Sequence, residues 1–184
     1  IEKNWDLNEG STRVLSPQFL TFEYNPIYDL IVVEDFDGIG LNYNKTIQSD
    51  TNLLITSDTS EVFHYPGETP NKSGKFVLPP VTLGEFKTLQ AFDLPKYGAN
   101  IWLEVNYKTD VALTFGVTAN EILQSAKTPV VTLFPNEEWN KVYINLVTEV
   151  SGYPNALDYN LFFGSINTTD DTATVLIDNI KLLY

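Results

Sequence analysis

Residues 101–108, IWLEVNYK, decide the fold because two kinds of side chain alternate along them. Successive side chains of a β-strand point to opposite faces of its sheet. One face of this strand would be apolar, with Ile101, Leu103, Val105 and Tyr107. The other face would carry Trp102, Glu104, Asn106 and Lys108. The segment therefore predicts a strand with one face in a core and one polar face that bears an indole ring.

The same alternation recurs in residues 141–147, KVYINLV. The core side would hold Val142, Ile144 and Leu146, and the outer side Lys141, Tyr143 and Asn145. We expect both strands to contribute to one core. If they are neighbours in the sheet, their outer sides form one continuous surface.

Short runs rich in β-branched and aromatic residues continue along most of the chain, separated by Gly, Pro, Asn and Asp. Roughly ten such runs without crossover helices predict an all-β fold, an antiparallel two-sheet β-sandwich of the jelly-roll kind. Residues 99–107 and 111–117 lie close enough to predict a hairpin. Residues 120–126 are the one helical candidate. The apolar phase of the last strand changes between Ile177 and Ile180, which predicts a bulge near Asp178.

Composition limits the domain organisation and the partners. Residues 1–12 are polar and aperiodic, so we expect an N-terminal arm or linker followed by a single β-sandwich domain over residues 13–184. The chain has no cysteine and therefore no disulfide. A formal charge of −13 opposes binding to nucleic acid. No apolar run is long enough to span a bilayer.

Several short motifs resemble, in their order and spacing, the C-terminal jelly-roll domain of Bacteroidetes surface lipoproteins, which is similar to galactose-binding-like carbohydrate-binding modules. They are VVEDFDG at 32–38, GETPNKSGKF at 67–76, LEVNYKTDVALTFGV at 103–117, WNKVYINL at 139–146 and VLIDNIKLLY at 175–184. The resemblance implies a location at the cell surface or in the periplasm. It also implies a signal peptide and a lipid-bearing cysteine upstream of Ile1, so that membrane attachment would be through the lipid alone.

The sequence identifies no catalytic residue. A Ser-His-Asp triad would have to use His64, the only histidine, and zinc would lack its usual ligands. Glycoside hydrolysis needs only two suitably spaced carboxylates, and 24 acidic residues leave that alternative open.

A structural calcium ion is the one cofactor that the sequence raises, and the expectation is otherwise that there is none. Jelly-roll binding modules often hold Ca²⁺ between the first and last strands, and oxygen ligands suit this ion. The candidate ligands are Glu34, Asp35, Asp37 and Asp178. The alternative is that Asp35 and Asp37 cap a turn while Asp178 accepts backbone hydrogen bonds at the bulge.

Sugar binding is the function that the polar strand faces favour. Pyranose rings stack on aromatic rings, while amides and charged groups bind the hydroxyls. The candidate ligand-binding residues are Trp102, Glu104, Asn106, Lys141, Tyr143 and Asn145. We therefore expect a non-catalytic envelope domain with a polysaccharide as its partner. The alternatives are a structural or interaction module that docks on an outer-envelope protein, and a glycoside hydrolase.

Overall fold

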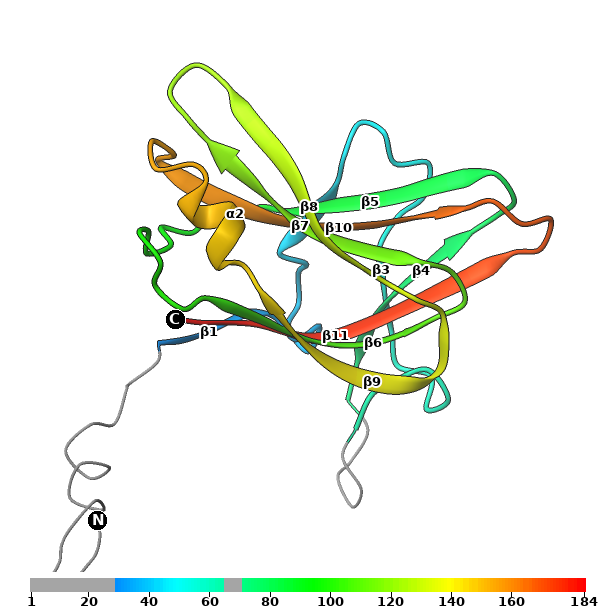
Figure 1. Cartoon of the computed structure of the whole chain (residues 1–184). Coiled ribbons are helices and arrows are strands. Elements are labelled where there is room, and N and C mark those ends of the chain that lie inside the picture. The colour runs from blue at the N-terminus through cyan, green and yellow to red at the C-terminus, as the bar shows by residue number, and fades with distance from the viewer. Residues whose placement is uncertain (1–28, 65–70) are drawn as a thin grey trace, which may run out of the picture.

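The computed structural model describes residues 29–64 and 71–184, and these residues form two antiparallel sheets packed face to face (Figure 1). Sheet A has the order β3-β4-β11-β6-β9, and β1 also pairs with β11. Its strands are β1 (Leu30–Glu34), β3 (Leu54–Thr56), β4 (Ser73–Leu78), β6 (Trp102–Thr109), β9 (Asn136–Asn145) and β11 (Ala173–Leu183). The predicted all-β sandwich is confirmed.

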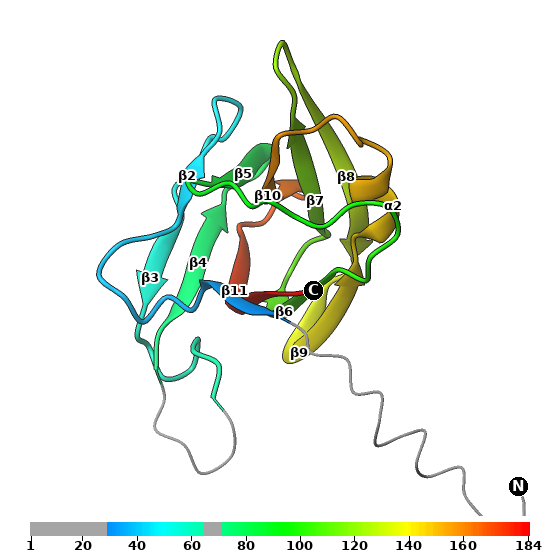
Figure 2. The ribbon, with the colours of Figure 1, turned by 90° about the vertical axis from the view of Figure 1, so that its left-hand side faces the viewer.

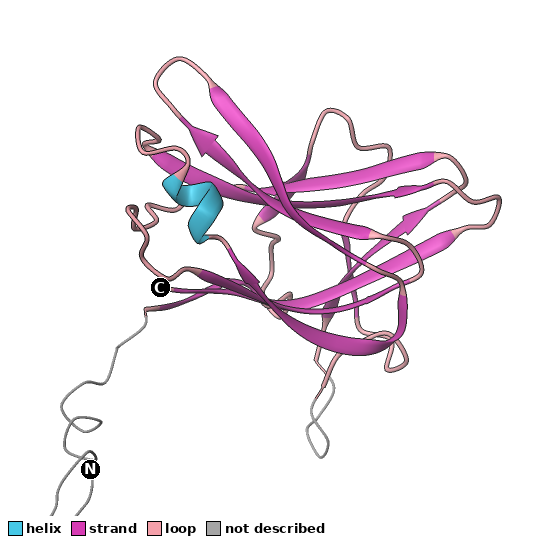
Figure 3. Ribbon diagram, viewed as in Figure 1, coloured by secondary structure: helices cyan, strands magenta, loops and turns pink. Residues whose placement is uncertain are grey.

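Sheet B has the order β2-β5-β10-β7-β8. Its strands are β2 (Tyr43–Lys45), β5 (Thr82–Thr88), β7 (Leu113–Asn120), β8 (Ser125–Leu133) and β10 (Asp158–Asn167). Seen from the side, the two layers enclose the core between them (Figure 2). One short helix, α2 (Val147–Ser151), lies at one end of the sandwich (Figure 3). None of the helices within the described ranges is long and apolar enough to cross a membrane.

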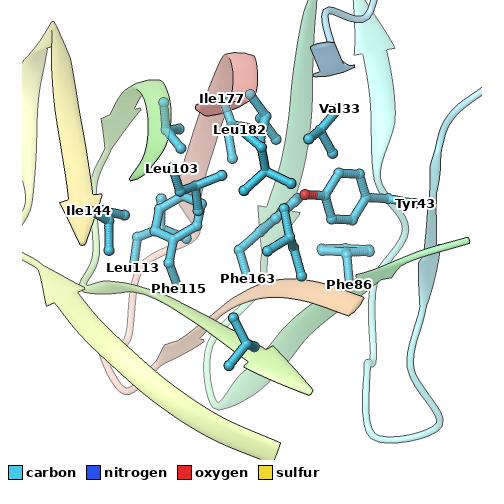
Figure 4. Close-up of a cluster of buried hydrophobic side chains, with 14 of the residues drawn as sticks. Val33, Tyr43, Phe86, Leu103, Leu113, Phe115, Ile144, Phe163, Ile177 and Leu182 are labelled. Carbon is cyan, nitrogen blue, oxygen red and sulfur yellow. The ribbon is translucent and has the colours of Figure 1, made fainter. Parts of the chain in front are cut away.

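The core forms where the inward residues of the two sheets meet (Figure 4). Phe86, Phe115 and Phe163 come from sheet B, and all three are almost completely buried. Leu103 and Ile144 come from sheet A and face them. The alternation of these residues with polar neighbours therefore places every second position of the central strands on an outer face.

The strands predicted from residues 101–108 and 141–147 are direct neighbours, because β6 pairs with β9. Leu103 lies opposite Ile144, and Val105 lies opposite Val142. The predicted bulge is also confirmed, since the register of β11 on β6 shifts between Asp178 and Lys181. Asn179 takes a φ of 50° there, which is the left-handed conformation that Asn adopts more readily than most residues.

The predicted hairpin between residues 99–107 and 111–117 is wrong. Strand β6 belongs to sheet A and β7 to sheet B, so the short connection crosses from one layer to the other. Val111 is buried in this connection, and the Thr109 hydroxyl donates a hydrogen bond to the Val111 carbonyl at 2.7 Å. A corner that packs its apolar residue into the core thus replaces the two-stranded turn.

The predicted helix over residues 120–126 is also wrong. Strand β7 ends at Asn120, the Glu121 amide donates to the Gln124 carbonyl at 2.8 Å, and β8 begins at Ser125. Ile122 and Leu123 at the tip are 81% and 95% exposed. A helix of about two turns is unstable without a buried face, so strand pairing on both sides prevails. The predicted arm, residues 1–12, lies outside the described residues.

Candidate functional site

The structure brings the six predicted ligand-binding residues together on the outer face of sheet A. Strands β6 and β9 place them as cross-strand pairs. The pairs are Trp102 with Asn145, Glu104 with Tyr143, and Asn106 with Lys141. Their adjacency, which the sequence left open, follows from the antiparallel register.

Glu104 lies at the centre of this face and is engaged by its neighbours. It is only 7% exposed, and its carboxylate accepts from the Lys141 ammonium at 2.9 Å and lies 3.3 Å from that of Lys181. Burial alone would raise the pKa of Glu104, but hydrogen bonds from Tyr143, Lys141 and Lys181 outweigh it and hold the pKa below its usual value. The negative charge of Glu104 is therefore neutralised by lysines of the protein itself.

Replacing Glu104 with glutamine should lower the free energy of unfolding by about 1–3 kcal/mol at pH 7, because two ammonium groups lose their shared anion. The difference should shrink as the pH falls below about 4, where the wild-type carboxylate loses its charge in the unfolded and then the folded state. Chemical denaturation at several pH values measures it. Glu137→Gln, an exposed change on the neighbouring strand β9, is the control, and equal stability of the two variants would contradict the prediction.

Asn106 is less accessible still, which corrects the expectation of an open polar face. It is 1% exposed, its Oδ1 atom has no hydrogen-bond partner among the described residues, and it lies opposite the buried Asp178. Trp102 is half-buried. Alternation assigned these side chains to the correct face, but neighbouring strands cover Glu104 and Asn106. Only part of the predicted surface can touch a ligand.

The four candidate calcium ligands each accept hydrogen bonds from nearby groups. Glu34 accepts from the amides of Phe36 and Asn42, at 2.9 and 2.6 Å. Asp35 accepts from the Asp37 amide, and Asp37 from the Lys72 amide. Asp178 accepts from the Ser73 hydroxyl at 2.9 Å and the Asn179 amide at 2.7 Å.

These contacts match the turn-capping and bulge alternative for the acidic residues. Within residues 29–64 and 71–184, no three histidine or acidic side chains are placed so that they could hold a metal ion. Calcium therefore remains an expectation of the resemblance alone.

The outer face of sheet B carries two adjoining hollows, which we call the groove. The first has a volume of about 540 Å³ and the second about 340 Å³. Strands β2, β5, β7, β8 and β10 and the segment after β2 line the first hollow. Its lining residues are Asn44, Lys45, Thr46, Ile47, Gln48, Glu85, Lys87, Thr88, Leu89, Thr118, Ser125, Lys127 and Asn160. The second hollow is lined by Leu83, Glu85, Ala112, Thr114, Lys127, Pro129, Thr132, Phe162, Gly164, Ser165 and Ile166.

Two glycines, which have no side chains, leave the outer face of sheet B shallow at its centre. Gly116 lies opposite Phe162, and Gly164 lies opposite Glu85 and Thr114. A Cβ atom on Gly116 would lie 2.5 Å from the Phe162 ring and 2.4 Å from the Thr128 carbonyl oxygen. Phe162 therefore lies down over the glycine, so that the sheet stays shallow at its centre.

An ion pair separates the two hollows. Glu85 and Lys127 line both of them, and the Lys127 ammonium donates to the Glu85 carboxylate. The Thr46 hydroxyl also donates to Glu85, at 2.8 Å. The same ammonium lies 4.7 Å from the centre of the Phe162 ring, a cation–π contact. The pair thus forms a polar ridge, with Phe162 beneath it.

The groove was missed because strand β2 was not recognised in the sequence and the start of β8 was assigned to a helix. Strand β2 falls in a polar stretch that looks like a loop, and β8 begins inside the predicted helix. The signal was present in the central strands. In β7, Thr114, Gly116 and Thr118 alternate with core residues, and in β10 Asn160 and Gly164 do the same.

Neither the models of known protein families nor the curated proteins give a match to this sequence. Solved structures do match it. The family 11 carbohydrate-binding module of the cellulosomal cellulase Lic26A-Cel5E of Clostridium thermocellum is similar at a TM-score of 0.53 and 15% identity, over 84% of this chain and 94% of that one. The same family 11 module in complex with a β-1,3-1,4-mixed-linked tetrasaccharide gives the same TM-score and identity.

The enzymatically active domain of tailspike protein 4 of bacteriophage CBA120 matches at a TM-score of 0.56 and 14% identity, over 82% of this chain but 20% of that one. A structure reported for carbohydrate-binding modules of the β-sandwich superfamily matches at a TM-score of 0.54 and 11% identity, over 78% of this chain and 57% of that one. At these identities the likeness shows the fold. The described part of the chain is a β-sandwich of the kind found in carbohydrate-binding modules.

Proposed function

We propose that this domain binds a polysaccharide without cleaving it, and that the polysaccharide lies along the groove of sheet B. The observation that carries the proposal is the pair of adjoining hollows, about 540 and 340 Å³, on the outer face of one sheet. Both volumes fall in the range of small-molecule sites, and two in a row suit an extended ligand.

The lining chemistry suits sugar hydroxyls. Asn44 and Gln48 are exposed at the edge of the first hollow, where their amides can donate and accept hydrogen bonds. The floor consists of paired strands, so the groove exists before a ligand arrives and little ordering is needed on binding. The likeness to carbohydrate-binding modules, one of them reported with a bound tetrasaccharide, supports the same function by analogy of fold.

A binding role is favoured over hydrolysis because Glu85 is the one carboxylate among the lining residues of the two hollows. Glycoside hydrolysis generally uses two carboxylates that flank the scissile bond. Glu85 is moreover held by Lys127 and Thr46.

The cellular setting rests on the sequence resemblance. We propose that the full-length protein is lipid-anchored at the cell surface or in the periplasm, as the resembling lipoproteins are. A polysaccharide-binding groove would then face the material outside the cell.

Binding of a panel of polysaccharides by affinity electrophoresis tests the groove against the face that bears Trp102. We expect the double variant Asn44→Ala/Gln48→Ala to lose roughly tenfold in affinity, from two hydrogen bonds of about 0.7 kcal/mol each. Trp102→Ala is the matched change on sheet A and should leave the affinity unchanged. The reverse pattern would transfer the site to sheet A, and no binding by the wild type would refute a glycan function.

A protein partner is the second candidate function, and an apolar strip favours it. Leu30 and Val32 on β1 are 60% and 51% exposed, and Leu183 continues the row toward Trp102. If an envelope protein docks here, Leu30→Ser/Val32→Ser should abolish its capture by the domain and leave polysaccharide binding intact. Unchanged capture would exclude this strip as the docking surface.

A further inference from the structure

The first hollow is positively charged, although the protein as a whole is strongly acidic. Lys45, Lys87 and Lys127 line it, and Glu85 is the single carboxylate among the lining residues. The chain has only 11 basic residues against 24 acidic ones, so three lysines in one hollow are a marked concentration. They come from β2, β5 and β8, three separate strands that the sheet brings together.

Two of these lysines are not used by the protein. Lys127 pairs with Glu85 and lies over Phe162. The side chains of Lys45 and Lys87, by contrast, take part in none of the ion pairs or side-chain hydrogen bonds made by the described part of the chain. Lys87 is also half-buried on the strand, opposite Phe162 and Asn44. Lys45, in contrast, lies opposite the core residue Phe86, so its side chain leaves β2 on the other face from Asn44. The Lys87 ammonium is therefore the group that can meet a ligand of opposite charge in the hollow.

The acidic residues elsewhere in the protein repel an anionic ligand, but this repulsion is weak inside the hollow for those that lie far from it. Charges more than about 8 Å apart in water are largely screened at physiological salt. Asp158, which lies on β10 one outward position beyond Asn160, accepts a hydrogen bond from the Asn120 side-chain amide at 2.7 Å. Contacts inside the hollow are thus decided by the lysines, which act as point charges on an anionic group.

We propose that the groove selects acidic polysaccharides, in which a carboxylate or sulfate group on a sugar ring binds to Lys87. This inference rests on the proposed polysaccharide-binding function and adds the ligand class. Hydroxyl groups of the same chain would meet Asn44 and Gln48 beside the lysines. The Lys127–Glu85 pair stays intact and marks the boundary with the second, more apolar hollow.

Isothermal titration calorimetry with four polymers tests the proposal: polygalacturonate, a sulfated galactan, a neutral mixed-linkage β-glucan, and poly-glutamate as a polyanion without sugar. We expect one of the two acidic polysaccharides to bind at least tenfold more tightly than the neutral glucan and the polypeptide. The carboxylated and sulfated arms distinguish the two sources of charge. Raising the salt from 50 to 300 mM should weaken this binding.

Lys87→Gln should lower the affinity for the acidic polymer about fivefold, the effect of one ion pair at 4 Å in water. Lys45→Gln removes a charge from the other face of β2 and should lower the affinity less. Lys108→Gln is the matched control, since Lys108 lies on β6 in the opposite sheet. Thermal melting checks that each variant is folded.

The possible outcomes distinguish the selection of acidic polysaccharides from polysaccharide binding in general. Equal binding of neutral and acidic polysaccharides, with no effect of Lys87→Gln, overturns the charge selection and leaves the groove as a glycan site. Equal binding of poly-glutamate overturns the selection of a sugar chain. Binding of none of the four polymers refutes both proposals.

Discussion

Replacing Phe163 with alanine is expected to lower the free energy of unfolding by about 3–5 kcal/mol, the cost of deleting a fully buried phenyl ring. The Phe163 ring is completely buried in strand β10. Four other aromatic rings surround it, with centroid distances from 4.8 Å to Tyr43 to 6.0 Å to Phe76. Phe86 and Phe115 complete the cluster, at 5.5 and 5.8 Å.

The loss should be at the upper end of this range because the neighbours belong to paired strands and cannot collapse into the cavity. Residues 162 and 164, on either side of Phe163, belong to the floor of the groove, so the variant should also weaken polysaccharide binding. Urea denaturation gives the stability, and the control is Phe134→Ala, a ring that is 80% exposed. A difference under about 1 kcal/mol between the two variants would show that the aromatic cluster does not hold the sheets together.

The parts of the fold that the sequence predicted correctly depend on local alternation. Residues 101–108 and 141–147 show a period of two, and they form the paired strands β6 and β9. The change of phase after Ile177 likewise predicted the bulge. In both cases neighbouring residues in the sequence carry the whole signal, because the pleat relates each side chain to the next.

The errors arose where a contact with a distant strand decides the structure. The chain after β6 passes to the other sheet, and residues 120–126 form a turn because β7 pairs with β10 and β8. Neither pairing can be read from a short window. The groove is of the same kind, since Asn44, Lys87 and Lys127 are far apart in the sequence and line one hollow only through the order of sheet B.

The burial of Glu104 has the same origin. Alternation placed it on the outer side of β6, and Lys141 and Lys181 then reach it from the two flanking strands. A polar side chain on an outer face was therefore predicted correctly by position but wrongly by accessibility.

Asp178→Asn is expected to stabilise the protein above pH 7, which is the opposite of what the loss of a structural acid usually does. Asp178 is completely buried at the bulge of β11. Burial, with a smaller contribution from the nearby Asp37 and Asp35, raises its pKa from 3.8 to about 7 against the opposing hydrogen bonds from Ser73 and Asn179. A buried carboxylate with no ammonium partner is costly in its charged form.

The direction follows from the two protonation states. Because the pKa in the folded state lies above that in the unfolded state, the folded protein favours the protonated acid. Its contribution is fully present below about pH 4 and is lost as the pH rises to about 7. Above pH 7 the cost is constant, with an upper limit of about 4 kcal/mol for a shift of about three units. Asparagine carries no charge at any of these pH values.

Asparagine also fits the contacts of the site. Its oxygen can accept from the Asn179 amide, while its amide can donate to the Ser73 hydroxyl or to Oδ1 of Asn106, which lies opposite residue 178. The Ser73 hydroxyl would lose Asp178 as its acceptor but would accept from the new amide, and a donor to Asn106 Oδ1 would offset that loss. The gain relative to wild type should therefore be small at pH 4, grow through pH 7, and remain constant at pH 8.

Urea denaturation from pH 4 to pH 8 measures this difference, with Asp170→Asn, an exposed change, as the control. The measurement also decides between the two roles considered for Asp178. If the carboxylate holds calcium, the wild type will melt at a lower temperature in EDTA, and Asp178→Asn will destabilise the calcium-loaded protein at neutral pH. If it is a buried acid at a bulge, EDTA will have no effect and the asparagine variant will be the more stable protein at pH 8.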